Sequence, residues 1–355
     1  MTSSVETRMD KRGESGGLMS ELVKNQHYVP QRYLKYFANT IKKKKKTISR
    51  LNVFDKEKLE IRVNQNIEGV ASERFFYDVD FDEIIKEAEE EGIKIEQEYM
   101  SLVKQVDRQT IEHTFATKVE TTMFDPIAEI VTTYTMIQKK AYINSFVIPE
   151  SKRAIIAYYL SLQFVRTKEF REKLIQMYEK GASLLVRKNL SEKIDKDFLD
   201  NVELKLKKSR INLFHNQELL DTKRLEEFSM CFLKHIWFIA VNETPISFWT
   251  SDNPLVLHGH LGNHGIKSKG VEIIFPITPK LALVMRELEY FEHDISLYNK
   301  FVPINEEFVK YCNSLQVHQS YRCIFSKDSD FYLASKMLKE HPELKNLARN
   351  RFIMG

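Results

Sequence analysis

The chain is poor in cysteine and carries little net charge. Its 355 residues include three cysteines, Cys231, Cys312 and Cys323, and none has the paired spacing of zinc ligands. Such an odd, sparse set argues against a disulfide scaffold and favours a reducing, cytoplasmic setting. The net charge of +4 provides no global field for binding nucleic acid, so any such affinity must come from local patches.

Long apolar runs are also missing. The most hydrophobic stretches, 154–165 and 236–241, are too short or too interrupted to span a bilayer, so no membrane partner is expected. Residues 1–24 lack the apolar centre of a secretory signal and are expected to form a disordered leader. The sequence has no phosphate-binding glycine loop and no dinucleotide fingerprint. It therefore demands no cofactor, although a divalent metal stays open.

What is present is the composition of a globular protein, with 43% hydrophobic and 29% charged residues. Strand patterns occur near both ends, at 47–54, 59–63, 236–241, 271–275, 281–286 and 321–326. Helical patterns occur at 96–106, 119–137, 151–178, 219–233, 305–315 and 331–338. We predict a single composite α+β domain, 25–340, whose N- and C-terminal β-containing parts pack together. A long, mainly helical middle segment, about 82–234, separates them, and 341–355 form a tail.

The segment 248–254 (Phe-Trp-Thr-Ser-Asp-Asn-Pro) is the most informative polar motif of the chain. Apolar, β-branched stretches at 236–241 and 246–250 predict a strand that ends in this polar cluster, and the proline predicts a sharp turn. Side chains at such a turn sit on a rigid support and can face a cleft. Alternatively, Ser251 and Asp252 bond their own backbone and only stabilise the turn.

Further motifs follow one another along the chain: His27-Tyr28-Val29-Pro30-Gln31, Gln163 with Arg166-Thr167, the 250–254 turn, Phe275-Pro276-Ile277-Thr278-Pro279, and Arg322-Cys323-Ile324-Phe325-Ser326. In this order they resemble the bacterial domain-of-unknown-function family 4238. The resemblance extends from about Gln26 to Ser326. It implies one continuous domain, but it implies no established activity, cofactor or partner.

The polar residues of these motifs make up the candidate site. The candidate catalytic residues are His27 as a general acid or base, Asp252 to orient the imidazole or hold a divalent ion, and Arg166 to bind phosphate or carboxylate. The candidate binding residues are Gln31, Gln163, Ser251, Asn253 and Asn305. The fold would have to gather these residues from both ends and the middle of the chain.

Three functional hypotheses remain open. The first is a phosphodiester-acting, nuclease-like hydrolase, or an effector of a bacterial defence or toxin module, which requires His27, Arg166 and Asp252 at one open cleft. The second is a binding or sensor protein that holds a small anionic ligand without turnover. In the third, the same residues form a buried polar network that fixes the N-terminal helix onto the C-terminal sheet.

Weaker patterns carry less weight. Arg108 and His113 have a spacing seen in some helical ribonucleases, but five positions on one helix do not share a tight face. His258, His260 and His264 could bind a metal, yet a flexible exposed loop is the stronger expectation. The lysine run 42–46 favours a solvated loop over a phosphate-binding patch.

Overall fold

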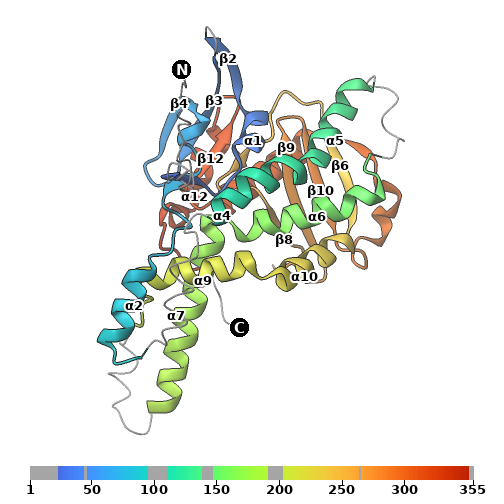
Figure 1. Cartoon of the computed structure of the whole chain (residues 1–355). Helices are drawn as coiled ribbons and strands as arrows, with labels where there is room; N and C mark the ends of the chain where they lie inside the picture. Colours follow the sequence, from blue (N-terminus) through green and yellow to red (C-terminus); the bar gives the residue numbers. More distant parts are fainter. Residues whose placement is uncertain are drawn as a thin grey trace, which may run out of the picture.

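The N-terminal part of the computed structural model is mainly β-structure. The structure describes residues 23–43, 46–94, 110–137, 147–190, 203–263 and 265–351. A hairpin of β2 (Asn39–Lys43) and β3 (Lys46–Asp55) projects from the body, as Figure 1 shows, and β4 (Glu60–Asn66) also pairs with β3. The remaining elements here are β1 (Asn25–His27), which pairs with β5 (Ser72–Arg74), and the short helices α1 (Gln31–Leu34), η1 (Lys35–Phe37) and η2 (Ile67–Gly69).

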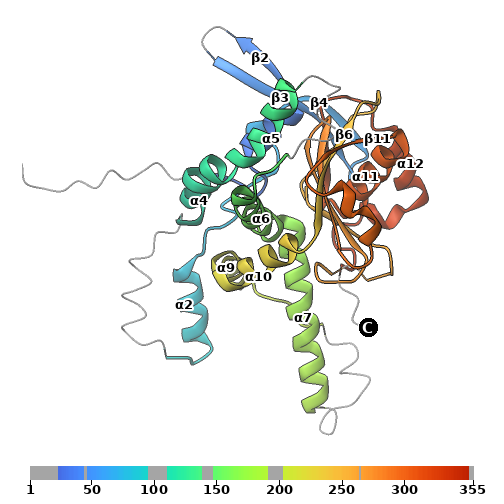
Figure 2. The same cartoon turned by 90° about the vertical axis from the view of Figure 1, so that its right-hand side faces the viewer.

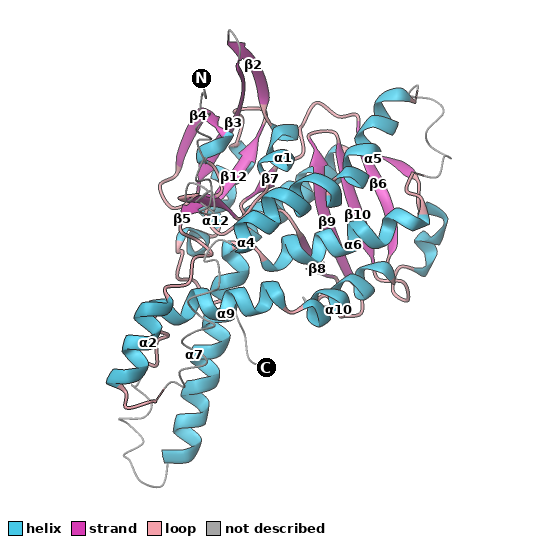
Figure 3. Ribbon diagram, viewed as in Figure 1, coloured by secondary structure: helices cyan, strands magenta, loops and turns pink. Residues whose placement is uncertain are grey.

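The middle of the chain is helical, as predicted. Its described helices are α2 (Phe81–Glu90), α4 (Thr110–Thr114), the π-helix η3 (Phe115–Met123), α5 (Asp125–Met136), α6 (Glu150–Val165), α7 (Lys168–Leu190), α9 (Lys208–Leu220) and α10 (Thr222–Leu233). Figure 3 shows α2 and the far end of α7 extending away from the sheets. Among the described residues, the structure contains no helix with the length and apolar character needed to cross a membrane.

Two helix boundaries differ from the prediction. The pattern at 151–178 predicted one helix, but the chain breaks between α6 and α7, because the Thr167 hydroxyl accepts the N–H of Phe170 at 3.2 Å and so caps α7. The predicted helix at 119–137 begins inside the π-helix η3. The predicted helix at 96–106 lies outside the described residues.

The C-terminal part contains a five-stranded sheet in the order β11-β6-β10-β9-β8. Its strands are β6 (Ile236–Asn242), β8 (Val256–Gly259), β9 (Val271–Thr278), β10 (Leu281–Arg286) and β11 (Phe301–Ile304). Every residue of β6 and β9 is buried, because helices cover both faces of the sheet, as Figure 2 shows. Helices α5, α6 and α10 cover one face, and α11 (Glu306–Gln319) covers the other.

The two halves of the fold join in a second sheet. It contains β2, β3, β12 (Cys323–Ser326) and β7 (Thr250–Ser251), with β4 paired to β3, so strands from both ends of the chain lie side by side. Helix α12 (Tyr332–Glu340) packs on this sheet, and the short helices η5 (Glu292–Leu297) and η6 (Pro342–Lys345) complete the fold. The α+β architecture with packed β-containing ends is therefore confirmed.

The central motif is placed differently from the prediction. Instead of ending one strand that continues from 236–241, the segment 248–254 contains β7, which lies in a different sheet from β6. The chain therefore crosses between the two sheets just before the motif. The Tyr33 hydroxyl fixes this crossing, since it lies 2.6 Å from Thr250 Oγ1 and donates to the Pro276 carbonyl at 2.7 Å.

Candidate functional site

Four of the eight predicted site residues lie together, with the buried Arg166 side chain at the centre and His27, Gln31 and Gln163 around it. Arg166 ends α6, is 1% exposed, and donates from Nη2 to the His27 carbonyl at 2.5 Å. Gln163, one turn earlier, donates to the Tyr28 carbonyl at 3.3 Å. His27 is 6% exposed; its Nε2 donates to the Glu68 carbonyl at 3.1 Å, and Gln31 lies 3.4 Å from its Nδ1. Both imidazole nitrogens are thus occupied.

Several polar atoms around Arg166 have no hydrogen-bond partner in the described part of the chain. They are Arg166 Nε and Nη1, Gln163 Oε1, the Tyr159 hydroxyl and Glu112 Oε2. The π-helix η3 supplies Phe115, whose ring lies 4.2 Å from the guanidinium, and Glu120 at 3.7 Å. Burial raises the pKa of Glu112 to about 7, and Arg166 opposes this shift. Burial, reinforced by Arg166, lowers the pKa of His27, so its imidazole is neutral near pH 7.

Asp252 does not join this group. It is 1% exposed, and its carboxylate accepts the backbone N–H groups of Tyr321, Arg322 and Cys323 at 2.7–2.8 Å. Burial raises the pKa of the Asp252 carboxyl, while these amides and Lys56 oppose the shift. Both carboxylate oxygens accept backbone N–H groups, so Asp252 holds the start of β12 in place and contacts neither its own turn backbone nor the N-terminal helix through these bonds.

The remaining predicted residues also make structural contacts. Ser251 Oγ lies 2.6 Å from Gln316 Oε1 and accepts the N–H of Asn253 at 3.2 Å. Asn253 donates to the Gln319 carbonyl at 2.9 Å. Asn305 lies apart from all of them: it is the N-cap of α11 and accepts the N–H of Phe308 at 3.0 Å. The structure therefore divides the predicted site into the Arg166 cluster, the turn at Ser251–Asn253, and a helix cap.

The weaker predictions gain no support. Among the described residues, no three His, Cys, Asp or Glu side chains lie where they could share a metal ion. His264, Arg108 and the centre of the lysine run lie outside the described residues. His258 and His260 face each other edge to face at 4.6 Å, and His260 is 3.5 Å from Glu272.

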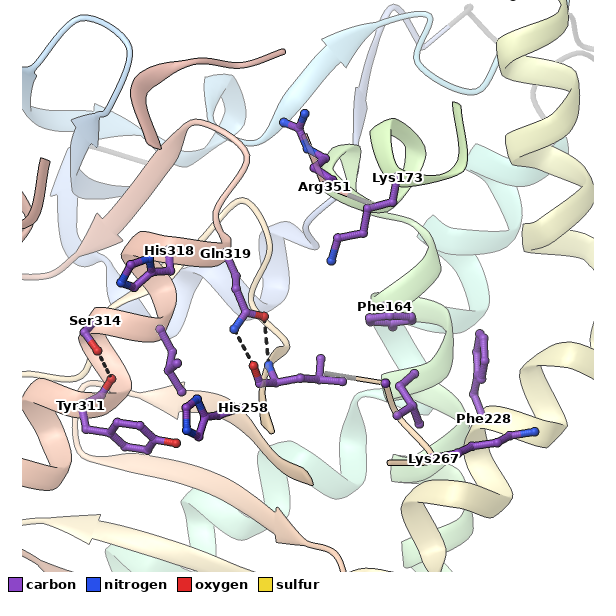
Figure 4. A pocket seen from close by; sticks show the side chains of 14 residues that line it. Phe164, Lys173, Phe228, His258, Lys267, Tyr311, Ser314, His318, Gln319 and Arg351 are labelled. Carbon is purple, nitrogen blue, oxygen red and sulfur yellow. Dashed lines mark hydrogen bonds between the residues drawn. The ribbon is translucent and has the colours of Figure 1, made fainter. Parts of the chain in front are cut away.

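An open cleft of about 990 Å³ lies elsewhere, between the helical layer and the edge strand β8 (Figure 4). Phe164 of α6 and Phe228 of α10 form one wall and pack edge to face, with ring centroids 5.7 Å apart. The opposite wall is α11, whose Gln319 side chain bonds both the N–H and the carbonyl of Leu257 in β8. The other lining residues are Lys173, His258, Gly265, Ile266, Lys267, Tyr311, Ser314, Leu315, His318 and Arg351.

The charged side chains that line this cleft are all basic. None of its lining residues in the described part of the chain is Asp or Glu. The Lys173 ammonium points toward the middle of the cleft in Figure 4, and it makes no hydrogen bond or ion pair with any described residue. Burial, reinforced by Arg351 and Arg349, lowers the pKa of Lys173, against the opposing effect of Glu169. An anion in the cleft would relieve this unbalanced positive charge.

A comparison with family models matches residues 25–330 to the family described as "Protein of unknown function (DUF4238)". The chain belongs to this family. The DUF4238 match confirms the resemblance seen in the motifs, and it ends before the C-terminal segment 346–351. No curated protein and no solved structure matches the chain.

Apart from His258, which the sequence offered only as a possible metal ligand, the cleft residues were not found from the sequence. Lys173 lies on a helix rich in lysine and glutamate, where a solvated face is the ordinary expectation. Phe164, Phe228 and Leu257 belong to hydrophobic patterns that predict core packing. The only usable signal was Gln163-Phe164 beside Arg166, because this motif marks the end of α6 that faces the cleft.

Proposed function

We propose that the protein binds a small ligand that combines an apolar body with an anionic group, in the cleft between α6, α7, α10 and α11. The observation that carries this proposal is the Lys173 ammonium, which points into the cleft without a partner among the described residues, while none of the described residues that line the cleft is acidic. The ligand is held without turnover, as in the binding alternative from the sequence, but by Lys173 in place of the His27, Arg166 and Asp252 set that the sequence offered for it.

The rest of the cleft supports such a ligand. A volume of about 990 Å³ lies at the upper end of the range typical of small-molecule sites. Phe164, Phe228, Leu257, Ile266 and Leu315 supply an apolar lining for the body of the ligand. Since a carboxylate or phosphate needs only one or two convergent polar groups, Lys173 suffices to orient it.

The phosphodiester-hydrolase hypothesis requires His27, Arg166 and Asp252 to converge at an open cleft. These three side chains are 6%, 1% and 1% exposed, and Asp252 spends both oxygens on backbone amides. The geometry therefore favours binding over hydrolysis, and a divalent metal at Asp252 or a nucleic-acid partner stays a prediction from the sequence.

The test compares three probes with one apolar body: 2-naphthoate, 2-naphthalenemethanol and 2-naphthylmethylammonium. Calorimetric titration of the full chain should show naphthoate binding about tenfold more tightly than the alcohol, and the ammonium compound binding least. Lys173→Met should reduce naphthoate affinity to that of the alcohol while leaving alcohol affinity unchanged.

The matched control is Lys86→Met, because Lys86 is exposed and, within the described part of the chain, its one ion pair is with Glu90 on α2, at 3.9 Å. This variant removes the same charge from the protein far from the cleft. If Lys86→Met lowers the affinity for naphthoate as much as Lys173→Met does, the selectivity comes from the net charge of the protein and the proposal is wrong. Equal affinity of wild type for all three probes would refute it as well.

A further inference from the structure

The C-terminal segment 346–351 is held against α7 by hydrogen bonds, beside the cleft. Gln176 of α7 bonds the backbone of this segment twice, through the Arg349 carbonyl at 2.9 Å and the Arg351 N–H at 2.8 Å. Arg349 also donates to the Ser320 carbonyl at 2.7 Å, at the C-terminal end of α11. The segment thus ties the helical wall of the cleft to its opposite wall.

Both arginines of this segment converge on one carboxylate. Glu169, near the start of α7, is 3% exposed, and its Oε2 lies 3.1 Å from Arg349 Nη2 and 2.9 Å from Arg351 Nε. In Figure 4 the Arg351 guanidinium is turned away from the middle of the cleft, whereas Lys173 points into it. Arg351 therefore influences the cleft through its charge and through Glu169.

Glu169 is also the natural partner of Lys173. The two residues are four positions apart on α7, with the glutamate N-terminal, which is the favoured order for an ion pair along a helix. Yet Lys173 makes no ion pair with any described residue, and both arginines bind the same oxygen of the carboxylate, Oε2. If the arginines were absent, Glu169 would be left to pair with Lys173 and to draw its ammonium out of the cleft.

We propose that Arg349 and Arg351 are positioning residues that set the anion selectivity of the cleft: by occupying Glu169, they keep the Lys173 ammonium unpaired and directed at the ligand. This inference rests on the proposed ligand function for its consequence, but the competition for Glu169 is a property of the protein alone. Two measurements therefore separate it from the ligand proposal.

The first measurement needs no ligand. Trace labelling of the full chain with acetic anhydride across a pH series, read by peptide mass spectrometry, reports the pKa of Lys173, because only the neutral amine reacts. In Arg349→Gln/Arg351→Gln the pKa of Lys173 should rise, since two neighbouring cations are lost and Glu169 becomes available. Adding Glu169→Gln to this variant should remove the part of the rise that comes from the new ion pair. The labelling of Lys86 serves as an internal reference.

The second measurement is the ratio of the alcohol and naphthoate dissociation constants. If the arginine substitutions only loosened the cleft, the affinities for both probes would fall alike and the ratio of the two dissociation constants would not change. We expect the ratio to fall about tenfold in Arg349→Gln/Arg351→Gln and to recover when Glu169→Gln is added. Thermal melts of each variant show that the compared proteins are folded.

The outcomes distinguish the two proposals. An unchanged pKa of Lys173 in the arginine variant overturns the competition for Glu169, whatever the ligand results. A raised pKa of Lys173 that Glu169→Gln partly reverses, with no binding of naphthoate by wild type, supports the competition and refutes the ligand function, whereas a rise that Glu169→Gln leaves unchanged overturns the competition. A fall in the ratio that Glu169→Gln does not restore means that the arginines act through the shape of the cleft, which also overturns the inference.

Discussion

Replacing Asp252 by asparagine tests the structural role of the central motif. The native carboxylate accepts three backbone N–H groups, from Tyr321, Arg322 and Cys323. Asparagine keeps one acceptor oxygen, which can still accept the N–H groups of Arg322 and Cys323, but it turns its amide group toward the N–H of Tyr321. One charge-assisted hydrogen bond is therefore lost and the other two lose their charge assistance. Each charge-assisted bond contributes about 1.5–3 kcal/mol, and the N–H of Tyr321 is left unpaired. We expect Asp252→Asn to lower the free energy of unfolding by about 3–5 kcal/mol.

The assay is urea unfolding followed by tryptophan fluorescence, since Trp249 is buried three positions from the substituted residue. Asp221→Asn is the matched control: Asp221 caps α10 by accepting the N–H of Arg224, and asparagine caps a helix equally well, so the change should stay within about 0.5 kcal/mol. A loss below about 1 kcal/mol in Asp252→Asn would refute the reasoning. It would mean that Asp252 is kept for a purpose other than holding the start of β12.

Three further predictions concern single side chains. Lys56 is buried and its pKa is lowered to about 7, so between pH 7 and its unfolded value of 10.5 the folded protein binds fewer protons than the unfolded chain. The free energy of unfolding of wild type minus that of Lys56→Met should therefore rise with pH above 7, by up to about 1 kcal/mol per pH unit; a difference that is flat with pH would contradict this. Asn305→Ala should cost about 1 kcal/mol through the lost cap of α11 and leave naphthoate affinity unchanged, as calorimetry would show. Tyr33→Phe should cost about 1–3 kcal/mol in urea unfolding, because the buried Pro276 carbonyl loses its donor and the Thr250 hydroxyl loses its acceptor; Tyr36→Phe, whose hydroxyl makes no hydrogen bond among the described residues, is its control.

The sequence predicted those strands whose hydrophobic pattern is set by burial of the strand itself. Alternation and apolar runs located β3, β4, β6, β9 and β10, because burial on one or both faces determines those patterns. The break at Thr167 was missed, since the apolar period continues through it and only the threonine cap interrupts the helix. The assignment of β7 to a different sheet from β6 was missed too, because sheet membership depends on pairing partners distant in the chain.

The candidate site was predictable only in part. His27, Gln31, Gln163 and Arg166 do lie together, because the N-terminal motif and the end of α6 pack against each other. Nothing in the local sequence shows that Asp252 faces three backbone amides and not the imidazole of His27. The position of Lys173 in the cleft could not be predicted from the sequence either, because its surroundings depend on arginines about 180 residues away that bind Glu169.

The motifs and the cleft are nevertheless connected. Asn253 accepts a hydrogen bond from Thr167, which caps the helix that carries Lys173, and it donates to the carbonyl of Gln319, whose side chain holds β8. The turn after β7 therefore fixes the spacing between the two walls of the cleft without lining it. On this argument the motif residues build the frame, and the contacts to the proposed ligand come from side chains with no recognisable pattern. A family can then keep one frame while the lining of the cleft sets the ligand.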